Sequence, residues 1–235
     1  MKNLNLNHIV LSFALCLVPM SALLAANDVP ARAPTLDTQG RFWIYRNGSL
    51  HPKMPFTPYG WMSDATNLNQ LIEVDLDCRE HPNTVWKVVG APERDTCIRM
   101  KVNWGEATWA GVAFISGPDK PAWWGDNNRG RYYNLSALPN KKLVFYARGE
   151  KGGESIKAQI GVLGKKPYGD SLHEPITGDD LTLTPNWVRY EVNLKDVPAE
   201  DLSRICNGFG IVADRSSQSG SGTEMQFYID DVYME

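Results

Sequence analysis

Short segments that alternate apolar and polar residues recur along the chain, and they constrain its fold more than any other feature. In VRYEVNL, residues 188–194, the side chains of Val188, Tyr190 and Val192 fall on one face, and charged or amide side chains fall on the other. The segment CIRMKVNW, residues 97–104, repeats this pattern. A period of two is typical of a strand with one buried face, because successive side chains point to opposite sides of a sheet.

Further segments of this kind, separated by turn residues, predict an all-β fold. Turn-forming residues include GEKGG at 149–153 and SGSG at 219–222. Only residues 199–205 have a helical pattern, which predicts a short connector. Regularly spaced short strands indicate a single two-sheet antiparallel β-sandwich of jelly-roll type. The predicted strands are residues 41–45, 71–76, 97–104, 110–116, 142–147, 156–163, 188–194, 208–213 and 226–234.

The N-terminal residues have the composition of an export signal. Lys2 precedes an apolar stretch that ends in two alanines before a polar segment. A cleavable signal needs this layout, whereas a membrane span needs about 20 uninterrupted apolar residues. We therefore expect residues 1–26 to be a removed signal peptide, residues 27–39 a flexible lead, and residues 40–235 one β-sandwich domain that is secreted or periplasmic and does not insert into a membrane.

Three cysteines follow the predicted signal, namely Cys78, Cys97 and Cys206. An oxidising compartment allows a disulfide, and an odd count leaves one thiol over. We predict a Cys78–Cys97 disulfide, because the segment between them reads as a loop between two strands. Closing such a loop stabilises a fold by about 3 kcal/mol in the chain-entropy model. Cys206 lies in the apolar context LSRICNGFG and is expected to be a buried thiol.

The charge balance and the absence of common enzyme motifs exclude several functions. The chain has 24 Lys and Arg against 27 Asp and Glu, and its basic residues do not gather in one tract, as they do in nucleic-acid binders. The sequence contains no Gly-x-Ser-x-Gly elbow, no phosphate-binding loop and no His-Glu-x-x-His motif. We therefore expect neither a nucleic-acid partner nor an organic cofactor.

All 8 tryptophans follow the predicted signal, and several stand among residues suited to sugar recognition. The C–H face of a pyranose packs on an aromatic ring, and nearby Asp, Asn and Arg side chains bond the hydroxyls. The segment WWGDNNRGRY at 123–132 has this mixture, and its two adjacent indoles cannot both point inward from an extended chain. A hydrophobic plug that closes the sandwich end is the alternative for this segment. The candidate ligand-binding residues are Trp123, Trp124, Arg131, Tyr132, Trp61 and Trp109.

Acidic residues alternate in the segment IEVDLD, where Glu73, Asp75 and Asp77 share one face of a predicted strand. Alternate residues on a strand are about 7 Å apart, which lies within the range of an inverting glycosidase pair. The same carboxylates suit calcium, and a solvated strand face is a third interpretation. On another predicted strand, Arg99 and Lys101 form a positive stripe that either meets an acidic sugar or is ordinary surface charge.

Two motifs in the C-terminal half, TPNWVRY at 184–190 and FYIDDV at 227–232, resemble those of the galactose-binding-like jelly rolls, over residues 96–235. That group includes many non-catalytic carbohydrate-binding modules of polysaccharide-degrading enzymes. The resemblance implies a sandwich whose concave face or rim loops bind sugar. It also implies a structural calcium ion, with Asp230 or Asp231 of the closing strand as a ligand.

The function expected from these observations is non-catalytic binding of a polysaccharide or oligosaccharide by Trp and Tyr stacking, with a place in a cell-envelope assembly as a further expectation. One alternative is a glycoside hydrolase or lyase on the jelly-roll scaffold that uses Glu73, Asp75 or Asp77. The other is a structural or interaction protein of the cell envelope. One fold hosts many functions, so the site has to decide among them.

Overall fold

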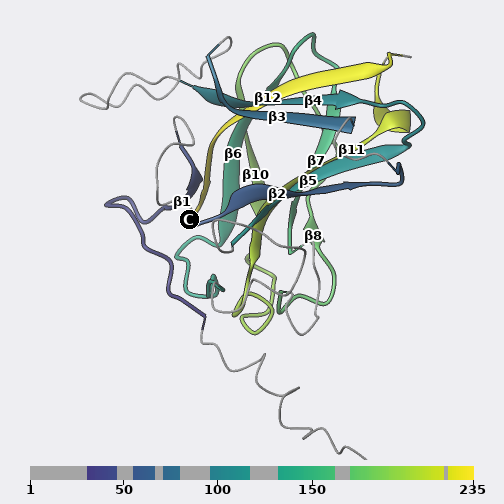
Figure 1. Ribbon diagram of the computed structural model, residues 1–235. Coiled ribbons are helices and arrows are strands. Elements are labelled where there is room, and N and C mark those ends of the chain that lie inside the picture. Colours follow the sequence, from purple (N-terminus) through teal and green to yellow (C-terminus); the bar gives the residue numbers. More distant parts are fainter. Residues whose placement is uncertain are drawn as a thin grey trace, which may run out of the picture.

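A computed structural model describes residues 31–46, 55–66, 71–79, 96–116, 132–161, 170–219 and 222–235 of the chain. The strands form two antiparallel sheets (Figure 1). The predicted all-β, two-sheet architecture is confirmed. None of the helices in the described part of the chain is long and apolar enough to cross a membrane. The predicted signal peptide lies outside the described residues and stays a prediction.

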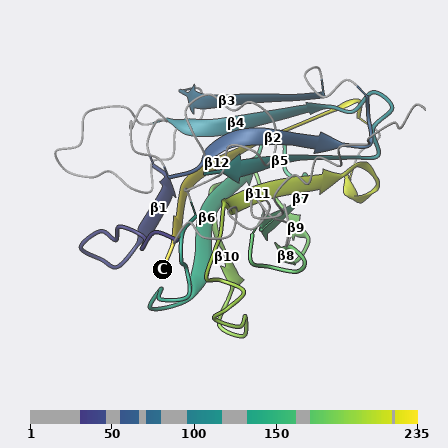
Figure 2. The same ribbon diagram turned by 60° about the horizontal axis from the view of Figure 1, so that its bottom comes forward.

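The first sheet has the strand order β10-β6-β12-β4-β3, and β1 also pairs with β12. Its strands are β1 (Phe42–Tyr45), β3 (Ile72–Cys78), β4 (Cys97–Asn103), β6 (Lys142–Gly149), β10 (Val188–Asn193) and β12 (Glu224–Met234). The long strand β12 pairs with β4 at one end and with β1 at the other, and a register shift after Asp230 separates the two parts. Asp231 in that shift has a φ of 46°. The C-terminus consequently lies beside β1 (Figure 2).

The second sheet has the order β2-β5-β11-β7-β8, and β9 also pairs with β7. Its strands are β2 (Thr57–Ser63), β5 (Trp109–Ile115), β7 (Ser155–Ile160), β8 (Ile176–Thr177), β9 (Leu181–Thr182) and β11 (Asn207–Asp214). The 3-10 helix η2 (Arg215–Ser217) follows β11. Sequence patterns did not predict β2, because Pro58 and Gly60 interrupt its alternation.

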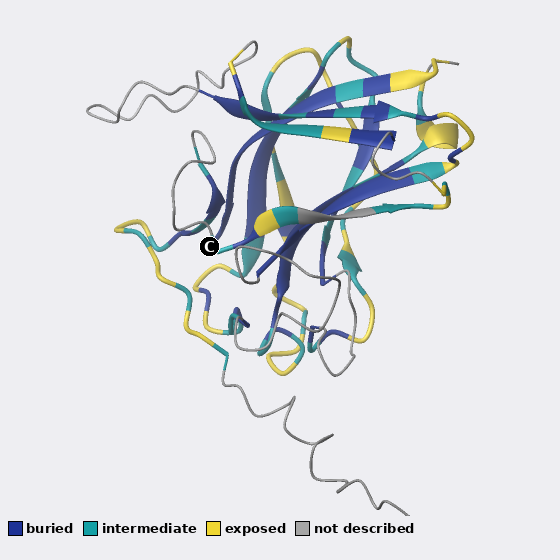
Figure 3. Cartoon of the chain, in the orientation of Figure 1, coloured by how far each residue is buried: buried dark blue, intermediate teal, exposed yellow. Residues whose placement is uncertain are grey.

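The core lies between the two sheets (Figure 3). Burial alternates along β4 and β7, whereas β5, β6, β11 and β12 are buried over most of their length. In β4, Ile98 and Met100 are buried while Arg99 between them is only partly so, which confirms the predicted alternation. Phe209 of the second sheet contacts Phe145 of the first, with ring centroids 5.7 Å apart. Aromatic rings therefore join the two layers directly.

One predicted helix and one predicted strand end are wrong. Residues 199–205, expected to be helical, form turns, because the backbone bonds from Asp201 and Leu202 both end on the Pro198 carbonyl and no regular ladder continues. Strand β7 ends at Ile160, short of the predicted 163, since Gly161 adopts a φ of 76° and its amide bonds the Asn207 carbonyl outside the ladder.

Candidate functional site

The predicted aromatic segment is only partly described. Trp123, Trp124 and Arg131 lie outside the described residues. Tyr132 is only 1% exposed, and the guanidinium carbon of Arg204 lies 3.9 Å from its ring centroid. Contrary to the expectation for Tyr132, its ring therefore offers no open face to a sugar.

Trp109 lies on the outward face of the second sheet. Its neighbour in the strand, Ala110, is part of the core, so alternation directs Trp109 to the other side. Trp109 is half-buried and pairs with Asp214 of β11. The next outward row runs across four strands through Met62, Gly111, Val212 and Lys157. We call the surface of Met62, Trp109, Lys157, Val212 and Asp214 the Trp109 face.

A small residue in the middle of the Trp109 face lets its neighbours approach closely. A Cβ atom on Gly111 would lie 3.0 Å from the Met62 Cε atom and 3.1 Å from the Val212 Cγ2 atom. A larger residue at this position would push these side chains outward. The glycine therefore leaves a shallow depression in the Trp109 face between the Met62 and Val212 side chains.

Hydrogen bonds from the end of β2 fix the backbone around Trp109. The Ser63 hydroxyl donates to the Trp109 carbonyl at 2.8 Å, and the Asp64 carboxylate accepts from the Thr108 amide at 2.9 Å. The bonds from the Thr108 hydroxyl and amide lower the pKa of Asp64, so this carboxylate stays ionised. On the other side, the Arg215 amide donates to the Thr108 carbonyl at 2.8 Å. The indole therefore projects from a backbone held at both edges.

Polar side chains stand beside the indole on the same sheet. The Lys157 ammonium lies 3.0 Å from the Asp214 carboxylate and 3.3 Å from that of Asp180. The hydrogen bond to Asp214 raises the pKa of Lys157, so the lysine stays charged. In the next row, the Gln159 amide donates to the Thr177 hydroxyl at 3.1 Å. A flat apolar ring beside donors and acceptors is the chemistry that a polyhydroxylated ring requires.

Trp61, another predicted candidate, belongs to β2. Its backbone pairs with Val112 of β5, one position from the Met62 pair on the Trp109 face. Its side chain lies outside the described part of the structure. Among the predicted tryptophans, Trp109 is the one whose side chain the structure describes, and it lies on an outward sheet face.

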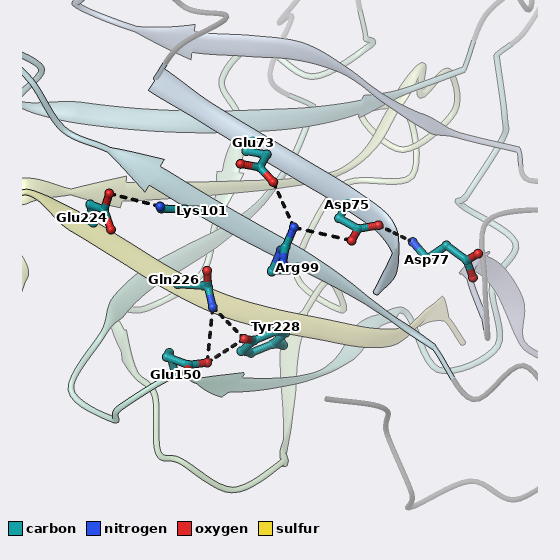
Figure 4. Close-up of polar contacts among 9 residues, drawn as sticks. All are labelled: Glu73, Asp75, Asp77, Arg99, Lys101, Glu150, Glu224, Gln226 and Tyr228. Carbon is teal, nitrogen blue, oxygen red and sulfur yellow. Dashed lines mark hydrogen bonds and ion pairs between the residues drawn. The ribbon is translucent and has the colours of Figure 1, made fainter. Parts of the chain in front are cut away.

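The predicted acidic cluster lies on the outward face of the first sheet and is partly neutralised (Figure 4). The Arg99 guanidinium lies 2.9 Å from the Glu73 carboxylate and 3.6 Å from that of Asp75. Asp75 also accepts a hydrogen bond from the Asp77 amide. The Glu73 and Asp75 side chains are 59% and 38% exposed, so they do not sit in the protected cleft that a catalytic acid requires. This geometry favours a solvated strand face.

The predicted positive stripe is neutralised by cross-strand pairs as well. Arg99 pairs with β3, and the Lys101 ammonium lies 3.1 Å from the Glu224 carboxylate of β12 (Figure 4). Exposed ion pairs of this kind contribute roughly 0–1 kcal/mol each. They leave little net charge on this face to attract an acidic sugar.

The predicted calcium ligands are buried at the register shift of β12. Asp230 and Asp231 are 0% and 1% exposed, and Asp230 accepts a hydrogen bond from the Asp231 amide at 2.7 Å. Calcium takes six to eight oxygen ligands. Among the described residues, however, no three His, Cys, Asp or Glu side chains converge as a metal site would require. The described residues do not by themselves fit a calcium cage, and the ion stays a prediction.

The three cysteines of the domain are buried thiols. Cys78 ends β3, Cys97 begins β4, and the two lie directly opposite each other in the antiparallel pair. The structure contains no disulfide between them, and the Cys97 sulfur lies 3.7 Å from the Cys78 carbonyl oxygen. The two predicted strands therefore pair at their cysteines, while the covalent bond stays a prediction.

The chain is a two-sheet antiparallel sandwich with an indole among polar side chains on an outward sheet face. This is the architecture expected of a carbohydrate-binding β-sandwich domain. Residues 78–235 match the family Carbohydrate binding domain 30, and the chain belongs to this family. The predicted resemblance to non-catalytic carbohydrate-binding modules is thereby confirmed. No curated protein matches the chain.

The chain is also similar to solved structures of carbohydrate-binding modules. One is the crystal structure of a family 30 module, at 15% identity and a TM-score of 0.49, with 83% of this chain and 98% of the module covered. Another is the family 30 module of a cellulosomal cellulase of Clostridium thermocellum, at 14% identity and a TM-score of 0.45, with 83% and 96% covered. The family 11 module of the same organism has 11% identity and a TM-score of 0.39, with 81% and 94% covered.

Proposed function

We propose that the Trp109 face binds a neutral polysaccharide chain without cleaving it. The observation that supports this proposal is the outward, half-buried indole of Trp109. Ser63 and Asp64 fix the backbone around it, and Lys157 and Asp214 lie on the same face. The ring packs against the C–H face of one sugar unit. The flanking side chains bond its hydroxyl groups. An open sheet face suits an internal stretch of a long chain, because both ends of the ligand extend past it.

We further propose that the protein is exported and acts outside the cytoplasm. Residues 1–26 have the layout of a cleavable signal, which supports this proposal. A polysaccharide too large to enter a cell is the ligand that such a location offers. A place in a cell-envelope assembly is consistent with it.

Affinity gel electrophoresis of the chain in soluble neutral polysaccharides tests the binding face. We expect Trp109→Ala to weaken retardation about tenfold or more, since a lost contact worth about 1.4 kcal/mol is tenfold in affinity. Trp187→Ala is the matched control, because that indole is also half-buried but packs beside Cys78 and Cys97 of the first sheet. Equal retardation of Trp109→Ala and the unaltered chain would overturn the proposed face.

A further inference from the structure

A pocket of about 470 Å³ lies at one end of the sandwich. Its size falls within the range of about 300–1,000 Å³ that small-molecule sites occupy. It lies between the first sheet, the β6–β7 loop and the segment that joins η2 to β12. We call it the end pocket. Its lining residues from these elements include Lys101, Trp104, Glu150, Lys151, Glu154 and Gln226.

Two side chains pin the loops that form the pocket. The Gln218 amide nitrogen donates to the carbonyls of Ser155 and Asp214, and its oxygen accepts from the Ser155 amide. The Ser219 hydroxyl donates to the Gly153 carbonyl at 2.9 Å. The segment after η2 is thereby fastened to the β6–β7 loop. The pocket is formed before any ligand arrives, which lowers the entropic cost of binding.

Glycines let these loops meet closely. Gly152 and Gly153 have φ angles of 86° and 91°, which L side chains rarely adopt. A Cβ atom on Gly153 would lie 2.3 Å from the Ser219 hydroxyl oxygen, and one on Gly152 would lie 2.8 Å from the Pro185 ring. A side chain at either position would push the pocket walls apart.

A hydrogen-bonded group of three side chains supports one wall of the pocket, with Glu150 and Gln226 in the lining and Tyr228 behind them (Figure 4). The Tyr228 hydroxyl donates to the Glu150 carboxylate at 2.6 Å, and the Gln226 amide nitrogen donates to the Tyr228 oxygen at 2.7 Å. Burial, and then the bond to Glu150, raise the pKa of Tyr228, so its hydroxyl stays protonated and donates. These bonds fix the Gln226 amide and turn its nitrogen toward the protein.

The end pocket presents both hydrogen-bond donors and hydrogen-bond acceptors. The Gln226 side-chain oxygen accepts no hydrogen bond from the described residues, and within the same part of the chain the Lys151 ammonium forms no ion pair. Trp104 is only 1% exposed, and its indole N–H donates to none of the described residues although the residue lines the pocket. An indole N–H is a donor only, so it bonds an acceptor oxygen of a ligand.

The charges around the end pocket nearly cancel. Lys101 and Lys151 contribute two positive charges, and Glu150, Glu154 and Glu224 contribute three negative ones. An anionic ligand would meet these carboxylates, so the lining disfavours it. A neutral hydroxyl both donates and accepts, and it therefore matches a wall that offers ammonium and indole donors beside an amide acceptor.

We infer that the end pocket is a second carbohydrate subsite, which takes one neutral sugar unit or the end of a chain by hydrogen bonding. The inference rests on the proposed sugar-binding function and adds a site to it. The two sites differ in chemistry, because the Trp109 face offers a ring for stacking and the end pocket offers pinned polar groups. A pocket bounded by the first sheet and two loops suits short ligands, which an open face holds weakly.

Chemical-shift titration of the chain with glucose, galactose, mannose, xylose, cellobiose and lactose tests the inference. We expect at least one of these sugars to shift the amides of Gly152, Gly153 and Gln226. Lys101→Met and Gln226→Leu should weaken this binding about fivefold or more. Lys142→Met is the matched control for Lys101→Met, since Lys142 lies on the same sheet, is similarly exposed and pairs with one glutamate at 2.9 Å outside the pocket.

The outcomes separate the two sites. Binding that persists in Trp109→Ala but weakens in Lys101→Met and Gln226→Leu supports the end pocket, whatever happens to polysaccharide retardation. The inference is overturned if none of the six sugars shifts the pocket amides, or if Lys142→Met weakens binding as much as Lys101→Met does. The inference would also be overturned if Trp109→Ala abolished the sugar-induced shifts while Lys101→Met and Gln226→Leu kept them, because the short sugars would then bind on the Trp109 face.

Discussion

At the scale of single residues, Asp37 shows how one carboxylate orders a segment that composition predicts to be loose. Its oxygens accept from the amides of Gln39 and Arg41, from the Arg41 guanidinium and from the Trp43 indole, at 2.8–3.0 Å. Burial opposes ionisation of Asp37, but these hydrogen bonds outweigh it and lower the pKa from 3.8 to about 2. The carboxylate thereby fastens the turn before β1 to the strand.

The substitution Asp37→Asn tests this role. An asparagine amide places a donor against the donors of Arg41 and Trp43, so we expect a loss of about 1–2 kcal/mol, or roughly 3–6 °C in Tm, at neutral pH. Because the folded pKa lies below the unfolded value, the contribution is full above pH 3.8 and is lost as the pH falls through about 2. Thermal melts of both proteins across this range measure it.

The control is Asp179→Asn, which changes an exposed carboxylate in the β8–β9 connection. It should leave Tm unchanged at every pH. If the difference in Tm between the unaltered chain and Asp37→Asn stayed constant down to pH 2, the Asp37 carboxylate would not act through its ionised form.

At the scale of elements, the pairing of β3 with β4 brings together two cysteines that lie far apart in the sequence. Cys78 and Cys97 face each other in the register, and both are buried. Burial raises the pKa of Cys97, so the thiol stays protonated and reacts slowly in the folded state. Oxidation is therefore expected to accompany folding, before the pair is buried.

Refolding with oxidised glutathione tests the disulfide. The two thiols lose two protons and two electrons to form the S–S bond, and glutathione disulfide is reduced to two thiols. We expect the unfolded, oxidised chain to expose one reactive thiol at residues 27–235, and the bond to stabilise the fold by about 3 kcal/mol. Cys206→Ser should keep the disulfide, whereas Cys78→Ser should abolish it. Three reactive thiols after oxidative refolding would refute the pairing.

At the scale of the whole molecule, the two sheets carry different chemistry on their outward faces. The first sheet presents cross-strand ion pairs, such as Arg99 with Glu73 and Lys142 with Glu191. The second sheet presents the Trp109 indole, and its Lys157 is paired with Asp214. Charges that are already paired steer a ligand only weakly. This arrangement supports the proposed binding of an uncharged chain by stacking.

Retardation in neutral polysaccharide should consequently depend little on salt. We expect affinity to change less than about twofold between roughly 50 and 500 mM NaCl, since screening acts on exposed charges and not on ring stacking. Affinity gels at both salt concentrations, with an acidic polysaccharide as the comparison, measure this. Strong retardation by the acidic polymer that disappears at high salt would favour recognition of charge instead.

The amino-acid sequence alone predicted most of the longer strands and much of the class of protein. Alternation in 97–104 and 188–194 is a property of neighbouring residues, so it survives without knowledge of the fold. The sequence also named Trp109 as a candidate, because an aromatic ring suited to sugar is visible in any context, and its role in binding stays a proposal. It missed β2, where proline and glycine break the pattern, and it overstated Tyr132, whose ring is covered by Arg204 from a distant segment.

Only the tertiary structure decided which residues share a site. The pairing of β5, β11 and β7 puts Lys157 and Asp214 on the same outward face as Trp109, and Arg99 neutralises Glu73 through the register of β3 with β4. The end pocket likewise joins Lys101, Glu154 and Gln226 from three separate segments. Strand register depends on contacts between residues far apart in the chain, and a one-residue slip of a strand would move its side chains to the other face.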